Sequence, residues 1–158
     1  MATAWVITVS DRCFRGDAED RSGPALVELL ERNGFQIAGR GLVPDEPDQI
    51  ITAIQSGIDA GVGLVVTTGG TGLAKRDVTP QSVAPLLDYE VPGLAEEMRR
   101  AGAAKTPNAL LSRSVAGVRG QTLILSLPGS VAGATESLES VLAVLGHALQ
   151  MLEGGAAH

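Results

Sequence analysis

The chain has 158 residues and a formal net charge of −6, with 44% hydrophobic but only 3% aromatic residues. This length suits one domain with its own core, and a core built from aliphatic side chains favours helices packed on a sheet over an aromatic-rich β-sandwich. The acidic balance argues against a general nucleic-acid-binding surface, because neutralising phosphates requires clustered Lys and Arg.

The cysteine content and the N-terminal sequence indicate in which cellular compartment the protein is expected. Cys13 is the only cysteine, so an internal disulfide or a thiolate zinc cluster is excluded. A catalytic thiol is disfavoured because only His147 and His158 are available as general bases. The N-terminus has no basic segment followed by an apolar one, and no apolar run approaches the ~20 residues of a membrane span. We therefore expect a cytoplasmic protein with no membrane partner.

The first part of the chain alternates predicted strands and helices. Trp5 to Val9 is an apolar, β-branched run that predicts a buried strand, and the polar segment 12–23 predicts a loop. A helix then begins with Ser22 or Gly23 as its cap and ends at Asn33-Gly34. Residues 35–43 predict a weaker strand, in which Gly39 and Gly41 mark a bulge or a close approach. The next helix begins at Pro47 and ends near Ala60-Gly61.

The most informative stretch is residues 61–80. Leu64 to Val66 is apolar without alternation, which is typical of a parallel strand covered on both faces. It leads into Thr67-Thr68-Gly69-Gly70-Thr71-Gly72, where ligands bind in open α/β sheets. Lys75, Arg76 and Asp77 follow, and Thr79 is positioned to cap a helix that begins at Pro80. This order predicts an anion-binding loop, whereas the alternative is a merely flexible turn. It has neither P-loop nor dinucleotide-binding spacing.

The remaining elements complete an α/β pattern. Residues 80–87 and 92–104 predict two short helices, each started by proline. Residues 114–118 and 122–127 predict a hairpin, and residues 131–152 predict a long closing helix. The predicted fold is therefore a three-layer, Rossmann-like α/β domain with a mostly parallel sheet, helices on both faces and a small antiparallel extension.

Two carboxylates are the candidates for chemistry. Asp45 and Asp77 each follow a predicted strand by a short loop, so both can face one crevice and hold Mg²⁺ together with phosphate oxygens. The alternatives are that Asp45 only stabilises a helix N-terminus, and that Asp77 only pairs with Arg76 or shapes a turn.

Several landmarks together resemble one family. T-T-G-G-T-G precedes R-D-V-T-P, and the chain also carries V-S-D-R-C-F-R-G (Val9 to Gly16), D-R-S-G-P (Asp20 to Pro24), V-P-D-E (Val43 to Glu46), L-S-R (Leu111 to Arg113) and S-L-P-G-S (Ser126 to Ser130). In this order they resemble the molybdenum-cofactor biosynthesis family of MogA and MoaB type, which includes the corresponding domain of gephyrin. The resemblance spans nearly the whole chain and implies a single molybdopterin-binding (MoCF) domain over residues 1–158.

The resemblance also implies an activity. Members of this family transfer AMP from ATP to the terminal phosphate of molybdopterin, with Mg²⁺, and release pyrophosphate. Asp45 and Asp77 match positions tied to this adenylyl transfer, as catalytic and metal-holding residues. The expected substrate-binding residues are Ser10, Asp11, Thr68, Gly69, Gly70, Thr71, Gly72, Arg76, Arg113, Ser126, Pro128, Gly129 and Ser130. The resemblance further implies a homotrimer and a molybdate-inserting enzyme as partner. One departure is Gln81, where relatives often carry an acidic residue, and we expect it to have little effect.

Two other functions remain open from the sequence. A non-catalytic molybdopterin-binding protein of MoaB type would have the same glycine loop, since loss of turnover leaves no mark in one sequence. A generic phosphate-ligand binder without a metal is the third, and the paired aspartates argue against it.

Overall fold

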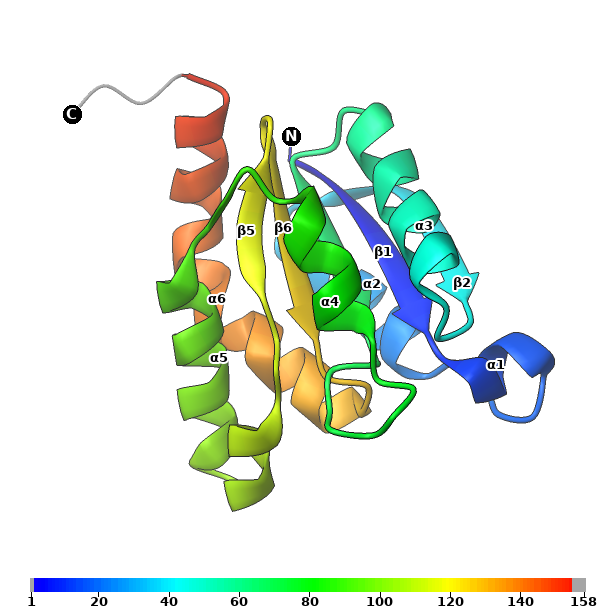
Figure 1. The fold of residues 1–158 in the computed structure, drawn as a ribbon. Coiled ribbons are helices and arrows are strands. Elements are labelled where there is room, and N and C mark those ends of the chain that lie inside the picture. The colour runs from blue at the N-terminus through cyan, green and yellow to red at the C-terminus, as the bar shows by residue number, and fades with distance from the viewer. Residues whose placement is uncertain (1, 155–158) are drawn as a thin grey trace.

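A six-stranded, mostly parallel sheet organises residues 2–154, which are the residues that this computed structural model describes (Figure 1). Strands β1 (Thr3–Val9), β2 (Gln36–Val43), β3 (Leu64–Thr68) and β6 (Thr122–Leu127) are parallel, and β5 (Ala116–Arg119) and β4 (Tyr89–Glu90) extend the sheet in antiparallel fashion. The strand order is β2-β1-β3-β6-β5-β4. The predicted α/β class with its antiparallel extension is thus confirmed.

Helices cover both faces of this sheet and bury two separate cores. Helices α2 (Ser22–Arg32), α5 (Pro92–Ala103) and α6 (Val131–Leu152) pack on one face, where Leu26, Met98 and Leu138 are fully or almost fully buried. Helices α3 (Pro47–Asp59) and α4 (Thr79–Val83) pack on the other face. The remaining helical segments are α1 (Asp11–Arg15), η1 (Ala84–Leu86) and η2 (Pro107–Leu111).

The strand order creates a switch point between β1 and β3. The chain passes from β1 to β2 on one side and then crosses back to β3 on the other side. The carboxyl ends of the parallel strands lie level, because Thr8 of β1 is in register with Thr68 of β3, which is in register with Leu127 of β6. In open α/β sheets this edge is the place for a ligand crevice.

The glycines of β2 explain its weak sequence pattern. The pairing of β1 with β2 shifts register between Ala4 and Trp5, so the predicted bulge is present. Gly39 lies against the Trp5 ring, and a Cβ at Gly39 would overlap that ring. Both the bulge and the close approach therefore occur at this point, as the sequence predicts.

Three local predictions at helix starts were wrong. The predicted loop 12–23 begins with α1, whose N-cap Ser10 accepts a hydrogen bond from the Cys13 amide. Neither Ser22 nor Gly23 caps α2, and the Gly23 amide instead donates to Asp20 Oδ1 at 3.1 Å. Thr79 is the first residue of α4 rather than its cap, and its hydroxyl donates to the Gly69 carbonyl at 2.9 Å.

The hairpin of β5 and β6 was predicted correctly, but its place in the sheet was not foreseen. Strand β6 is also the parallel neighbour of β3, so it belongs to the centre of the sheet and only β5 and β4 form the extension. The two-residue strand β4 and the segment η2 were not predicted, because neither has an apolar repeat long enough to signal an element.

Candidate functional site

A cavity of about 540 Å³ opens at the carboxyl ends of β1 and β3. Its lining combines the end of β1, the glycine loop and the turn before α6, and it contains both predicted carboxylates. The predicted site residues in this lining are Ser10, Asp11, Asp45, Thr68, Gly69, Gly70, Asp77, Gly129 and Ser130. Segments that are far apart in the sequence therefore meet at one place, as the parallel topology predicts.

A second cavity of about 440 Å³ adjoins the first. The two share four lining residues, Gly70, Asp77, Gly129 and Ser130, which we call the shared wall. The second cavity adds Thr71, Gly72 and Pro128 from the predicted set, and Leu111 and Ser112 from η2 and the residue after it. Two neighbouring compartments with a common polar boundary suit two ligands that react with each other, or one elongated ligand.

The glycine loop lies so close to neighbouring backbone that side chains would not fit. Gly69 and Gly70 have φ of 111° and 71°. A Cβ on Gly70 would overlap the Thr79 hydroxyl and lie 3.1 Å from Asp45 Oδ1. The loop is held by a hydrogen bond from the Gly69 amide to the Leu127 carbonyl (3.0 Å) and by one from the Thr79 amide to the Gly70 carbonyl (3.1 Å). Glycine is required here both by the positive φ and by the space.

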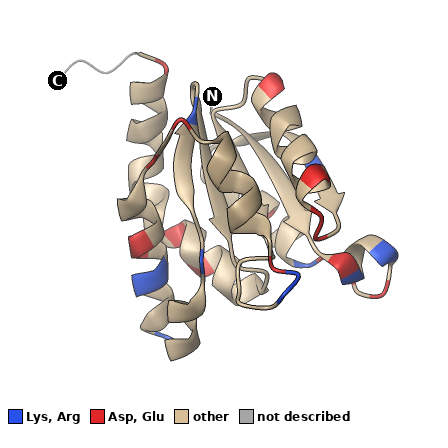
Figure 2. Ribbon diagram, in the orientation of Figure 1, with Lys and Arg blue, Asp and Glu red and all other residues tan. Residues whose placement is uncertain are grey.

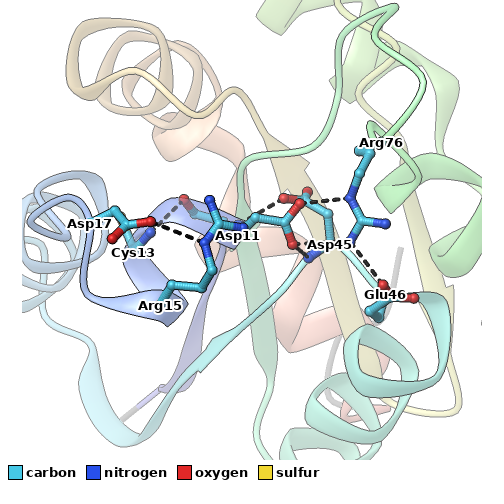
Figure 3. Close-up of polar contacts among 8 residues, drawn as sticks. Asp11, Cys13, Arg15, Asp17, Asp45, Glu46 and Arg76 are labelled. Carbon is cyan, nitrogen blue, oxygen red and sulfur yellow. Dashed lines mark hydrogen bonds and ion pairs between the residues drawn. The ribbon is translucent and has the colours of Figure 1, made fainter.

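Asp45 and Asp11 hold each other through reciprocal hydrogen bonds (Figure 3). The Asp11 amide donates to Asp45 Oδ2 at 2.9 Å, and the Asp45 amide donates to Asp11 Oδ1 at 3.0 Å. The pairing is possible because β1 and β2 are parallel neighbours whose last residues, Val9 and Val43, are in register. This pairing was not predicted from the sequence.

The pKa values of Asp11 and Asp45 are shifted in opposite directions. Burial, with repulsion from Asp11 and Asp77, raises the pKa of Asp45. The pKa of Asp11 is lowered, chiefly because Arg76 donates to it at 2.7 Å and 3.1 Å. The two predicted catalytic carboxylates, Asp45 and Asp77, line the same cavity.

Asp77 ends a tight turn in the loop after β3. Its Oδ2 accepts from the Ala74 amide at 3.0 Å, and its own amide donates to the Ala74 carbonyl at 2.9 Å. The half-buried side chain lies in the shared wall. Among residues 2–154 there is no cluster of three or more His, Cys, Asp or Glu side chains that would hold a metal by itself. A pair of carboxylates fits Mg²⁺, which completes its octahedron with waters and substrate phosphates.

Three predicted binding residues lie outside both cavities. Arg76 pairs with Asp11 and with Glu46 (2.8 Å), so it connects the glycine loop to the start of α3. Arg113 donates to loop carbonyls and to Gln81. Ser126 is fully buried in β6, where its Oγ accepts from the Val115 amide at 2.7 Å. The side chains of all three residues therefore bond to other protein groups near the cavities.

Several lining residues were not predicted as part of the site. The first cavity also contacts Thr8, Arg12, Cys13, Glu19, Asp20, Arg21, Ser22 and Val131. Asp20 accepts from the Thr8 hydroxyl at 2.9 Å and lies 3.5 Å from an Arg40 nitrogen, so it fixes the start of α2 beside the cavity. The D-R-S-G-P landmark was the available signal, since it combines charge with a helix start. Figure 2 shows that charged residues mark α1 and the tip of the glycine loop, whereas the strands carry little charge.

Comparison with known proteins agrees with this geometry. Residues 5–147 match the family described as probable molybdopterin binding domain. The chain belongs to this family. The match includes every residue of the shared wall, and the family resemblance drawn from the sequence is confirmed.

Solved structures share the fold over nearly the full chain. A molybdopterin biosynthesis enzyme MoaB from Thermus thermophilus is 54% identical, with a TM-score of 0.92 and coverage of 98% of each chain. A MogA structure is 39% identical with a TM-score of 0.91, covering 95% of this chain and 99% of that one. The α/β architecture of the family is thus the architecture of this chain.

Sequence relatives differ in length. The chain is 41% identical to a molybdopterin adenylyltransferase of Haemophilus influenzae, over 86% of this chain and 71% of the relative. It spans only 48% of a molybdenum cofactor biosynthesis bifunctional protein of Chlorobaculum tepidum and 22% of gephyrin of Dictyostelium discoideum, at 38% and 39% identity. Between residues 2 and 154, none of the helices has the length and hydropathy to span a membrane.

Proposed function

We propose that this chain transfers AMP from ATP to the terminal phosphate of molybdopterin in molybdenum cofactor biosynthesis, with Mg²⁺, and releases pyrophosphate. The observation that carries the proposal is the pair of adjoining cavities with Asp77 and the glycine loop in their shared wall. The identity of the proposed substrates follows from relatives that are named molybdopterin adenylyltransferase. One cavity would receive the nucleotide and the other the pterin, so that the two reacting phosphates meet at the shared wall.

In the proposed reaction, an oxygen of the molybdopterin phosphate attacks the α-phosphorus of ATP. A new P–O bond forms there, while the bond from the α-phosphorus to the oxygen bridging to the β-phosphate breaks and carries its electron pair away with pyrophosphate. Both partners are anions that repel each other, so the protein must orient them and neutralise charge. Such positioning is most of what catalysis of phosphoryl transfer requires.

The end of the first cavity offers a helix N-terminus to those phosphates. Helix α6 has 22 residues, and its N-cap Ser130 accepts from the Gly133 amide at 3.0 Å. Gly129 and Ser130 belong to the shared wall, which places the positive end of this helix dipole beside the proposed reaction site. Gly129 also packs against Gly69, and a Cβ on Gly129 would lie 3.3 Å from the Gly69 Cα.

Asp45 and Asp77 would hold Mg²⁺ in this proposal. When bound, the ion supplies positive charge that offsets repulsion between the phosphates. Asp45 Oδ2 is occupied by the Asp11 amide, whereas Oδ1 faces Gly70. Burial, together with repulsion from Asp11 and Asp77, raises the pKa of Asp45 in the protein alone, and a cation placed between the carboxylates would relieve the repulsion.

The second candidate is a molybdopterin-binding protein without turnover, because the matching family is described only as a probable molybdopterin binding domain. Incubating the purified chain with molybdopterin, ATP and Mg²⁺, and measuring adenylylated molybdopterin and pyrophosphate, separates the two. Product in excess of the protein concentration supports the enzyme. Stoichiometric molybdopterin binding without product supports the binding protein.

We further propose that a molybdate-inserting enzyme consumes the product. Adenylylation turns the terminal phosphate into one that has a good leaving group, which suits a following displacement step. Relatives named bifunctional are about twice as long as this chain, and their additional length is consistent with a second activity.

A further inference from the structure

Asp77 is located on a loop that has no helix or strand of its own. Residues 69–78 connect β3 to α4, and Leu73, Ala74, Lys75 and Arg76 are exposed. Apolar burial therefore contributes little to the position of this loop, and hydrogen bonds must fix it. A carboxylate that is to act on a phosphate needs a backbone that does not shift by an ångström.

Arg113, which lies just after η2, supplies hydrogen bonds to this loop. Its amide donates to the Thr71 carbonyl at 2.8 Å, its Nε to the Gly72 carbonyl at 2.9 Å and one terminal nitrogen to the Asp77 carbonyl at 2.7 Å. The other terminal nitrogen donates to Gln81 Oε1 on α4 at 3.1 Å. One half-buried residue thus bonds both ends of the Gly72–Asp77 segment and the helix that follows it.

Guanidinium geometry is what makes this possible. The group is planar and rigid, and it directs donors along three directions at once. A lysine ammonium at the end of a flexible stem can reach one of these acceptors but cannot hold Gly72, Asp77 and Gln81 together. None of the ion pairs among residues 2–154 involves Arg113, so its bonds go to neutral acceptors of the protein.

The segment that carries Arg113 is itself anchored. Arg99 on α5 donates to the Ser114 carbonyl at 2.9 Å, and Ser114 is buried. The loop with Asp77 is therefore connected through Arg113 to α5 and the centre of the fold. By contrast, Arg76 fixes the exposed tip of the loop through ion pairs that are open to solvent.

We propose that Arg113 is a positioning residue for Asp77, which it holds in the shared wall by binding the carbonyls at both ends of the loop. In this role Arg113 acts through the loop and does not itself bind the substrate. The inference rests on the proposed adenylyl transfer for its effect on turnover, but its effect on the loop is independent of that function.

The experiment compares wild type with Arg113→Ala, Arg113→Lys and Arg119→Ala. Arg119 is the matched control, since it also reaches a backbone carbonyl of another segment, that of Leu86 at 3.4 Å, and lies outside the two cavities. Limited trypsin digestion under native conditions reports the loop directly, because Lys75 lies in it, and fragment masses identify cleavage at that bond. Steady-state kinetics with molybdopterin, ATP and Mg²⁺ give kcat and KM, which show the effect on the proposed site.

For Arg113→Ala we expect cleavage after Lys75 to accelerate about tenfold. We expect kcat to fall about 100-fold while the KM values stay within roughly twofold of wild type. Arg113→Lys should give a cleavage rate and a kcat between those of wild type and Arg113→Ala. This variant keeps the test valid where the alanine variant fails to fold. Arg119→Ala should match wild type in both measurements.

Two results would overturn the inference. If cleavage after Lys75 is unchanged in both Arg113 variants, then Arg113 does not hold the loop. If KM rises steeply while kcat is retained, Arg113 binds a substrate. Should wild type itself show no turnover, the proposed function fails, and the trypsin measurement alone then decides whether Arg113 orders the loop.

Discussion

Asp11 and Asp45 show how one pair of hydrogen bonds gives two carboxylates different tasks. Each accepts from the other's amide, yet of the two only Asp11 accepts hydrogen bonds from Arg76, which lower its pKa, while burial and repulsion raise the pKa of Asp45. Asp11 is thus already neutralised by the protein. Asp45 has no such cation and faces the cavity, so it is the one suited to accept a metal ion.

The Asp11 ion pair predicts a pH dependence of stability. Because the folded-state pKa of Asp11 lies below its ordinary value of 3.8, the pair stabilises the fold above that pH, and the contribution is lost as the pH falls through the lowered pKa. Asp11→Asn keeps the acceptor for the Asp45 amide but loses the ion pair. We expect a lower Tm than wild type at neutral pH and a difference that shrinks in acid. A difference that grows in acid would contradict the assignment.

Asp45→Ala tests whether this carboxylate serves chemistry or only the start of α3. We expect kcat/KM to fall about 100-fold, with a higher Mg²⁺ concentration needed for half-maximal rate. Asp48→Ala is the control, since Asp48 is the acidic residue in the first turn of α3 and lies outside both cavities. A lower Tm with unchanged specific activity in Asp45→Ala would mean that the helix-start interpretation is correct.

At the scale of elements, the site was predictable where local chemistry alone determines it. The run from Leu64 to Gly72 predicted a buried strand that ends in a ligand loop; the buried strand is confirmed, and the loop after it lines the first cavity. Contacts between distant segments were not predictable. Ser126 and Arg113 belong to landmarks that resemble the family, but which way a side chain faces depends on the neighbours of its strand or loop, and one sequence does not give that information.

The same limit explains the missed helix starts. Ser10 and Ser22 both have the chemistry of a cap, but only Ser10 uses it. At α2 the carboxylate of Asp20 provides the acceptor for Gly23, and at α4 the Thr79 hydroxyl is taken by the glycine loop. At α2 the predicted cap was thus replaced by a side chain only three residues before Gly23, and at α4 a tertiary partner, the Gly69 carbonyl, took the Thr79 hydroxyl.

Substitutions at two glycines with positive φ, Gly70 and Gly16, should differ sharply in their effect on molybdopterin affinity. Gly70→Val must adopt an unfavourable φ and also displace Thr79 and the Asp45 carboxylate, so we expect loss of both stability and molybdopterin affinity. Gly16→Ala is the control, because Gly16 has φ of 85° with nothing within 4 Å of an added Cβ. It should cost about 1 kcal/mol of stability and leave affinity unchanged. Equal molybdopterin affinity in Gly70→Val and wild type would refute the role of the loop.

At the scale of the whole molecule, the homotrimer implied by the family resemblance stays a prediction. In the apolar region 91–104, Val91 and Leu94 pack against the chain's own core. Exposed apolar side chains lie elsewhere, with Leu73, Leu110 and Leu111 exposed by 67%, 66% and 54%. Leu111 also lines the second cavity, so an interface there would lie close to the site.

Sedimentation equilibrium at micromolar concentration decides the assembly. We expect three times the chain's mass of 16.2 kDa, since association would cover these leucines. Leu110→Glu should shift the equilibrium toward the monomer, because it replaces an exposed apolar side chain by a charged one that would be costly to bury. A wild-type mass near that of one chain would exclude a stable trimer.

We propose that Asp77 in the shared wall takes part in adenylyl transfer between two bound substrates. The turnover of Asp77→Ala, measured as adenylylated molybdopterin formed at saturating Mg²⁺, tests it most directly. Asp59→Ala, at the exposed end of α3, is the control. We predict that Asp77→Ala retains its fold and molybdopterin binding but loses about 100- to 1,000-fold in kcat. Turnover equal to wild type would contradict the account.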